Sequence, residues 1–131
     1  MHTPAIIDFP RFHDRDVFLT VAENGNIPFD IQRVFYLTGL NEEVVRGEHA
    51  HKTSRQLLVA LSGTIEVRLE NTSGEVFEFS LDQENKALYI PPMYWGKIRF
   101  SQGAIGLGIA SDNFSEEDYI RDYDEFKSMG S

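Results

Sequence analysis

Apolar and polar residues alternate with a period of two along most of the chain, which is typical of half-buried β-strands. The clearest case is a pair of alternating segments, 64–70 and 77–81, which a turn sequence Asn-Thr-Ser-Gly joins into a predicted hairpin. The other strand candidates lie between turn residues: 17–22, 31–37, 47–51, 56–61, 87–90, 96–100 and 104–110. So many short strands predict an all-β sandwich or barrel.

One helix is expected, near the C-terminal end. Ser115 is interpreted as its N-cap, and the acidic residues that follow suit the positive end of a helix dipole. Four apolar residues then recur at helical spacing: Tyr119, Ile120, Tyr123 and Phe126. We therefore predict a helix that covers one end of the sheet.

Composition and charge narrow the class of protein. With 131 residues, 41% hydrophobic and 25% charged, residues 1–131 are expected to form a single globular domain. The absence of cysteine excludes disulfides, thiolate metal sites and a cysteine nucleophile. The formal net charge of -9 argues against nucleic acid or an anionic membrane as the main partner. Neither a secretory signal nor an apolar run long enough to cross a bilayer is visible, so a cytoplasmic protein is expected.

The segment 46–52, Arg-Gly-Glu-His-Ala-His-Lys, is the most informative part of the sequence. In a strand, His49 and His51 point to the same face, ~7 Å apart, and Ala50 points to the other. Two imidazoles on an interior face are costly unless they bond to something. A pair of satisfied polar core residues, or an exposed strand edge, is the alternative. Two histidines at this spacing favour a functional site.

The His-X-His sequence resembles the start of the metal motif of the cupin family of small barrels. In that family a glutamate and a further histidine complete the ligand set, but Gln56 and Gly96 occupy those positions here. An amide is a poor ligand and glycine supplies no side chain, whereas a catalytic divalent metal normally needs at least three protein ligands. We therefore expect no metal and no cofactor.

Without a metal, neighbouring histidines are best interpreted as acid–base groups, because imidazole titrates near neutral pH. That chemistry suits the movement of a proton between adjacent carbons through an enediol. The substrate feature is then a carbonyl beside an alcohol-bearing carbon. Tyr36 or Arg46 is a candidate donor to the developing enolate oxygen.

The sequence also resembles one specific group, the dTDP-4-keto-6-deoxyglucose 3,4-ketoisomerases, which are WxcM-like sugar-nucleotide cupins. The resemblance spans nearly the whole chain, and these segments carry it: 26–29, 31–36, 46–52, 56–59 with Gly63, 89–92 with Trp95, 110–112 and 118–126. It implies a cupin-type jelly roll that forms a homodimer with exchanged strands. It also implies a metal-independent isomerase that moves the keto group of a dTDP-linked 6-deoxyhexose from C4 to C3, before amination to an unusual deoxyamino sugar of a surface glycan.

The resemblance also implies roles for individual residues. The catalytic set is His49 and His51 as the acid–base pair, with His51 removing the C3 proton, and Tyr36 and Arg46 at the sugar or the enediolate. For substrate binding, the resemblance places Arg33 at the diphosphate. The residue types themselves suggest the rest of the substrate-binding set: Lys52, Gln56 at a histidine or a hydroxyl, and Tyr94 and Trp95 against thymine.

Each role has a simpler alternative that the sequence leaves open. An internal salt bridge satisfies Arg33 as well as a diphosphate does. Tyr36 is compatible with a strand-surface aromatic, and Trp95, beside two prolines, with a packing anchor. Gly96 stands where family members often carry a histidine, which leaves the proton route on that side open.

Two other functions are kept as alternatives. The first is a non-catalytic cupin that binds a nucleotide sugar, because fold does not fix function. The second is a metal-dependent cupin enzyme in which an acid such as Glu48 or Glu66 joins the two histidines.

Overall fold

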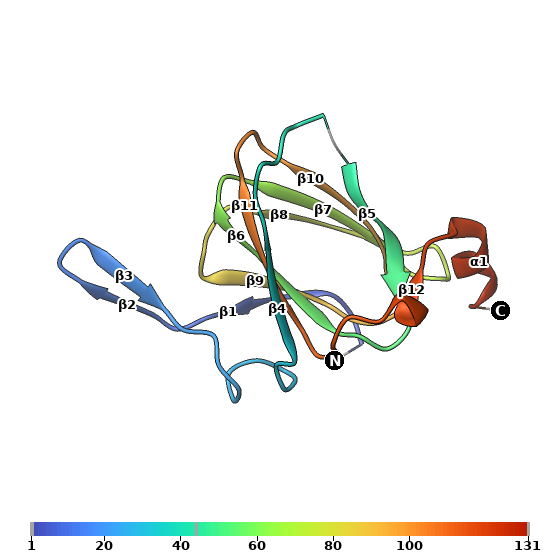
Figure 1. The fold of residues 1–131 in the computed structure, drawn as a ribbon, viewed down its shortest axis with the longest axis horizontal. Coiled ribbons are helices and arrows are strands. Elements are labelled where there is room, and N and C mark those ends of the chain that lie inside the picture. The colour runs from blue at the N-terminus through green and yellow to red at the C-terminus, as the bar shows by residue number, and fades with distance from the viewer. Residues whose placement is uncertain (1, 44, 131) are drawn as a thin grey trace.

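The computed structural model describes residues 2–43 and 45–130, which form two five-stranded antiparallel sheets packed against each other (Figure 1). In spatial order, the first sheet contains β1 (Ala5–Asp8), β9 (Lys86–Ile90), β6 (Gln56–Ser62), β11 (Ile105–Ala110) and β4 (Arg33–Leu37). The second contains β12 (Tyr119–Ile120), β5 (Val45–His51), β10 (Trp95–Phe100), β7 (Ile65–Glu70) and β8 (Val76–Leu81). Strands distant in sequence lie side by side in both sheets, as in a jelly roll.

The predicted alternation places the core between the two sheets. In β7, Ile65, Val67 and Leu69 are buried, while Glu66 and Arg68 between them are exposed. Every strand expected from the sequence is present, with its ends shifted by at most two residues. The all-β prediction is confirmed. The short strands β1 and β12, and the polar β2, escaped prediction because none has an alternating pattern long enough to recognise.

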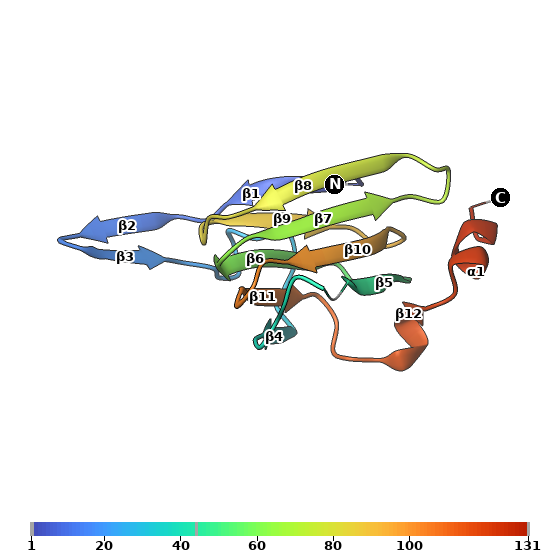
Figure 2. The same cartoon turned by 90° about the horizontal axis from the view of Figure 1, so that it is seen from above.

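A separate hairpin projects from the sandwich on the side away from the C-terminal helix (Figures 1 and 2). It pairs β2 (Arg11–Asp14) with β3 (Val17–Thr20). We call this hairpin the arm. Four of its large apolar side chains are between 52% and 66% exposed: Phe12, Val17, Phe18 and Leu19. The arm thus carries an apolar surface that residues 2–43 and 45–130 leave uncovered.

The C-terminal segment corrects the helix prediction. Ser115 precedes only a 3-10 turn, η1 (Glu116–Asp118), and its side chain forms no capping hydrogen bond. The α-helix is α1 (Tyr123–Ser128), and its N-cap is Asp122, whose side chain accepts from the backbone N–H of Glu125. The helix therefore begins later than predicted, because Tyr119 and Ile120 pair with β5 as strand β12 instead. Pairing with a neighbouring strand has overridden a local helical pattern.

Helix α1 closes one end of the second sheet. Its residue Phe126 is fully buried and clusters with Ala50, Trp95 and Ile120. The buried carboxylate of Glu70 accepts hydrogen bonds from Tyr123 Oη at 2.6 Å and from Lys127 Nζ at 3.1 Å, both on the helix. Within the described ranges, no helix has the length and apolar character needed to pass through a membrane.

Candidate active site

A β-bulge in β5 sets the direction of the histidines. Gly96 of β10 pairs with His49, but the next residue, Lys97, pairs with Gly47, so Glu48 is the extra residue. Gly47 and Glu48 both have positive φ, at 87° and 45°. An extra residue reverses the alternation of side chains on that strand. As a result Arg46 lies on the same face as His49, although the two are three positions apart, and both line one cavity.

The two histidine rings lie together, as the spacing predicts. Their centroids are 5.0 Å apart and the rings are nearly perpendicular, at 87°. The ring of Tyr119, from β12, lies 4.9 Å from His49 and 4.5 Å from His51, so it forms an aromatic wall against both. Arg121 stacks over Tyr119 at 4.4 Å and is held by a two-point ion pair with Glu116.

His49 has one nitrogen engaged and one available. Its Nδ1 lies 2.6 Å from the carbonyl oxygen of Gly47, and because a carbonyl can only accept, Nδ1 must carry the hydrogen. No residue in 2–43 or 45–130 forms a hydrogen bond with Nε2. Burial lowers the pKa of His49 from 6.5 to about 4, against the opposing effect of the Gly47 bond. At neutral pH, Nε2 is therefore an unprotonated acceptor at the cavity.

His51 is engaged at both nitrogens. Only 8% of the residue is exposed, its Nδ1 lies 2.9 Å from Asp118 Oδ2, and its Nε2 lies 3.2 Å from the side-chain nitrogen of Gln56. Burial lowers the pKa of His51, and the Asp118 carboxylate only partly offsets this. Burial raises the pKa of Asp118, but hydrogen bonds from His51 and Thr53 outweigh burial and keep it below its usual value. Asp118 is not apparent as a site residue from the sequence, because 67 positions separate it from His51.

His49 lines a cavity of about 220 Å³, whereas His51, whose ring centroid is 5.0 Å from that of His49, is not one of the lining residues. Apolar side chains from both sheets form most of its wall, and its polar lining comes from these residues: Arg33, Arg46, His49, Gln56 and Tyr119. Four of the residues singled out in the sequence therefore meet at one cavity, together with Tyr119, which had been predicted only as part of a packing helix.

Arg33 has aromatic neighbours instead of a carboxylate. Its guanidinium lies 4.6 Å from the ring centroid of Phe35 and 5.3 Å from that of Phe114. It forms no ion pair with any carboxylate in the described part of the chain. Of the two explanations that the sequence left open, an internal salt bridge is therefore not found, and the cation at the cavity remains available to an anion.

The structure does not bring Tyr36, Tyr94, Trp95 or Lys52 to this cavity. Tyr36 lies on the opposite face of β4 from Arg33 and is 73% exposed, because side chains alternate along a strand. Lys52 is exposed in the loop after β5 and lines none of the cavities described here.

The two aromatics of the Pro-Pro segment serve packing. Trp95 is 5% exposed and packs on Tyr123 and Phe126 of helix α1, with ring centroids 5.4 and 5.7 Å away. Tyr94 is 8% exposed, lies in the main core and donates its hydroxyl hydrogen to the carbonyl of His2. The structure therefore places neither ring at the histidine cavity, and their contact with thymine stays a prediction.

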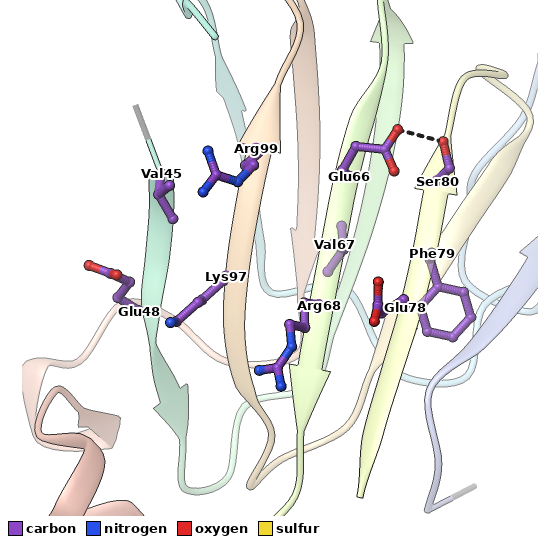
Figure 3. Close-up of a pocket in the computed structure, with 10 residues that line it drawn as sticks. All are labelled: Val45, Glu48, Glu66, Val67, Arg68, Glu78, Phe79, Ser80, Lys97 and Arg99. Atoms are coloured by element: carbon purple, nitrogen blue, oxygen red, sulfur yellow. Dashed lines mark hydrogen bonds between the residues drawn. The ribbon is translucent and has the colours of Figure 1, made fainter. Parts of the chain in front are cut away.

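A second hollow, of about 550 Å³, lies on the outer face of the second sheet (Figure 3). Cations from β7 and β10 and acids from β5, β7 and β8 line it, and the Ser80 hydroxyl donates to Glu66 at 2.9 Å. Glu48 and Glu66, the acids considered for a metal site, line this outer hollow and not the histidine cavity. Among residues 2–43 and 45–130, no group of three or more histidine or carboxylate side chains is placed to hold a metal ion.

Comparison with known proteins gives consistent matches over the whole chain. Residues 2–131 match the family described as FdtA, WxcM-like, C-terminal. A TDP-4-oxo-6-deoxy-alpha-D-glucose-3,4-oxoisomerase from Aneurinibacillus thermoaerophilus is 40% identical over 124 residues, which is 93% of this chain and 88% of that protein.

Solved structures agree with these matches. The crystal structure of QdtA, a sugar 3,4-ketoisomerase from Thermoanaerobacterium thermosaccharolyticum in complex with TDP, has a TM-score of 0.92 and 36% identity, and the match covers 96% of this chain and 93% of that chain. A 3,4-ketoisomerase from Helicobacter canadensis has a TM-score of 0.92 and 37% identity, with 98% of each chain covered.

The jelly roll and the histidine pair at its cavity, taken with these matches, define a cupin-type isomerase. The chain belongs to the FdtA, WxcM-like family, which confirms the resemblance found in the sequence.

Proposed function

We propose that this protein is a metal-independent 3,4-ketoisomerase that converts TDP-4-keto-6-deoxyglucose into a TDP-3-keto-6-deoxyhexose, a precursor of a deoxyamino sugar. The observation that carries the proposal is His49, whose unprotonated Nε2 is the unoccupied nitrogen of a histidine at the cavity. The relatives named for this reaction, or solved with TDP, support the substrate class.

The reaction needs one base and a route for one hydroxyl proton. His49 Nε2 removes the hydrogen from C3 as a proton, the C–H electron pair becomes the C3=C4 double bond, and the C4 carbonyl oxygen takes the negative charge. The proton of the O3 hydroxyl then passes to O4. When His49 returns its proton to C4, the double bond closes back to a carbonyl at C3, and atoms and electrons balance without an added oxidant or reductant.

His49 is a better candidate for this base than His51, which the resemblance favoured. A base needs a free lone pair within reach of the substrate. Gln56 occupies Nε2 of His51 and Asp118 occupies Nδ1, so His51 has no lone pair to offer without breaking a bond. We therefore assign the C3 proton to His49 and a supporting role to His51.

Two cations of the cavity complete the proposal. Arg46 lies on the same face as His49 and is the donor for the negative oxygen of the enediolate. Arg33, which forms no ion pair within the described residues, is the partner for the diphosphate.

Solvent-deuterium exchange tests the function directly. In deuterated water, TDP-4-keto-6-deoxyglucose should gain label at C3 or C4 and form the 3-keto isomer, at equal rates with and without a chelator. TDP binding without exchange supports the non-catalytic alternative. Loss of exchange on chelation, together with stoichiometric metal in the protein as purified, supports the metal-dependent one.

We further propose that the arm pairs with a second copy of the chain. An isolated two-stranded hairpin is marginally stable in water, and this one exposes Phe12, Val17, Phe18 and Leu19 on a projection from the sandwich. Light scattering at micromolar concentration should give the mass of a dimer. Phe18→Asp should shift the mass toward the monomer, whereas Asp16→Asn in the turn of the arm should not. A monomeric wild-type protein overturns this proposal.

A further inference from the structure

Asp118 is the most heavily hydrogen-bonded carboxylate at the site. Its Oδ2 lies 2.9 Å from His51 Nδ1 and 3.4 Å from the backbone N of Ser54. Its Oδ1 accepts from the backbone N–H of Thr53 at 2.8 Å and lies 2.9 Å from the Thr53 hydroxyl, whose single hydrogen it shares with Asp112. Its side chain is only 12% exposed. The residue ends η1, immediately before the strand that carries Tyr119, and thus ties the C-terminal segment to the histidine strand.

The charge of Asp118 fixes where the hydrogen of His51 lies. An ionised carboxylate only accepts hydrogen bonds, so Nδ1 of His51 must donate. Because His51 is neutral at pH 7, its Nε2 then has a lone pair and no hydrogen. The group that faces this lone pair must be a donor, which makes it the amide N–H of Gln56.

The direction of the Gln56 amide follows from that bond. A primary amide carries its donor and its acceptor on opposite branches, so an N–H aimed at His51 turns the carbonyl oxygen away from it. Gln56 lines the cavity, and within the described ranges its carbonyl oxygen accepts no hydrogen bond. A half-buried acceptor without a partner is suited to a ligand hydroxyl.

We propose that Asp118 is a positioning residue: through His51 it fixes the Gln56 amide so that the amide oxygen accepts a hydrogen bond from a sugar hydroxyl. This rests on the proposed function only for the identity of the ligand. The chain of contacts from Asp118 to Gln56 belongs to the protein itself.

A purely structural role for Asp118 makes a different prediction, and Asp112 provides the matched control. Thr53 Oγ1 lies 2.9 Å from both carboxylates, so either one helps to hold this loop. Only Asp118 also reaches His51. Asp112→Asn therefore removes the same charge beside the same threonine and leaves the Nδ1 bond of His51 in place.

Asp118→Asn should reverse the direction of each hydrogen bond that links residue 118 through His51 to Gln56. The side-chain oxygen of the new amide is retained by the Thr53 backbone N–H at 2.8 Å, which is a closer donor than the Ser54 backbone N–H at 3.4 Å on the other side. Its NH2 group is then left facing His51. A donor at that place makes Nδ1 the acceptor and moves the hydrogen to Nε2, and the Gln56 amide then turns its oxygen to His51 and its NH2 to the cavity. The loss of one acceptor for a hydroxyl should lower kcat/KM by about 10- to 100-fold.

The test combines nitrogen NMR with kinetics. In 15N-histidine-labelled protein, His51 should carry its hydrogen on Nδ1 in the wild type and in Asp112→Asn, and on Nε2 in Asp118→Asn. The kcat/KM of Asp112→Asn should stay within about threefold of the wild type. In a Gln56→Ala background, Asp118→Asn should cost little more, because the group through which it acts is gone.

Several results overturn the inference. They are a hydrogen on Nε2 of His51 in the wild type, equal kinetic losses in Asp118→Asn and Asp112→Asn, or full additivity with Gln56→Ala. Failure of the proposed function is a separate result, in which the wild type exchanges no deuterium into the substrate. In that case the NMR comparison still shows whether residue 118 determines which nitrogen of His51 carries the hydrogen.

Discussion

His49 Nδ1 lies 2.6 Å from the carbonyl oxygen of Gly47, two positions earlier in the same strand. This contact is possible because Gly47 and Glu48 form a bulge with positive φ, which brings the carbonyl under the imidazole. The strand thus supplies its own orienting group for the histidine. Backbone geometry at one glycine therefore decides which nitrogen faces the cavity.

Replacement of His49 by Asn should lower kcat by about 10²- to 10⁴-fold, the usual contribution of a general base. His51→Asn should cost less and should retain measurable deuterium exchange at C3, because His49 remains. Single-turnover rates and label incorporation measure both. If His51→Asn abolishes exchange and His49→Asn does not, the two assignments must be interchanged.

The acid limb of the pH–rate profile, where kcat/KM falls, should occur at unusually low pH for a histidine base. Because the pKa of His49 is about 4, the base stays unprotonated well below the 6.5 that is ordinary for histidine. A plot of kcat/KM against pH should stay flat down to about pH 5 and fall near pH 4. An inflection near 6.5 contradicts a buried base.

Stability should fall as the pH is lowered from 6.5 toward 4. In that range the unfolded chain binds a proton at His49 and the folded chain does not, so protonation favours unfolding. Below about pH 4 both states are protonated, and this contribution changes no further. Urea midpoints at pH 7 and pH 5 should differ, and the difference should shrink in His49→Asn. An equal difference in the variant assigns the effect to other groups.

Gly47→Ala should impair both fold and activity. A Cβ at this position meets the carbonyl oxygen of Gly96 at 2.9 Å, and φ is 87°, a conformation that alanine rarely adopts. Relief of this strain moves the carbonyl that holds His49. We expect a loss of kcat larger than that of Gly103→Ala, where φ is also positive but a Cβ meets nothing within 4 Å. Equal effects contradict a special role for the bulge.

Tyr123→Phe should lower the free energy of unfolding by more than Ser80→Ala does, because it removes one of the two donors to a buried carboxylate oxygen. The acceptor is Glu70, which is 7% exposed and receives the Tyr123 hydrogen bond at 2.6 Å. Ser80→Ala, which removes a donor to the exposed Glu66, is the control and should cost less than about 0.5 kcal/mol. Urea titration of both variants measures the difference.

Alternation along the chain was enough to predict most strands and the shared face of the two histidines. It failed in the C-terminal segment, where the spacing of Tyr119 and Ile120 imitates a helix but the pairing partner is β5. A local pattern holds no information about a strand that lies far away in the sequence. For the same reason the local pattern does not indicate Asp118, whose contact with His51 forms only when the C-terminal segment packs against β5.

The two aromatics of the Pro-Pro segment show a second limit. Alternation places Gly96 and Trp95 on opposite faces of β10, but it does not say which face meets the cavity. The choice depends on the helix that covers Trp95, and therefore on tertiary packing. Arg33 and Gln56 do lie at the cavity with His49, a proximity that periodicity alone does not indicate, whereas their roles toward a substrate stay predictions.

Asp118 and Tyr119 follow the histidines that they contact by slightly more than half the length of the chain. The ribosome therefore adds the carboxylate and the phenol ring of the candidate site after both histidines. Prematurely terminated products that end before Asp118 carry both imidazoles but neither the carboxylate nor the phenol ring beside them. For production of active enzyme, the integrity of the carboxyl end matters more than the position of the histidines suggests.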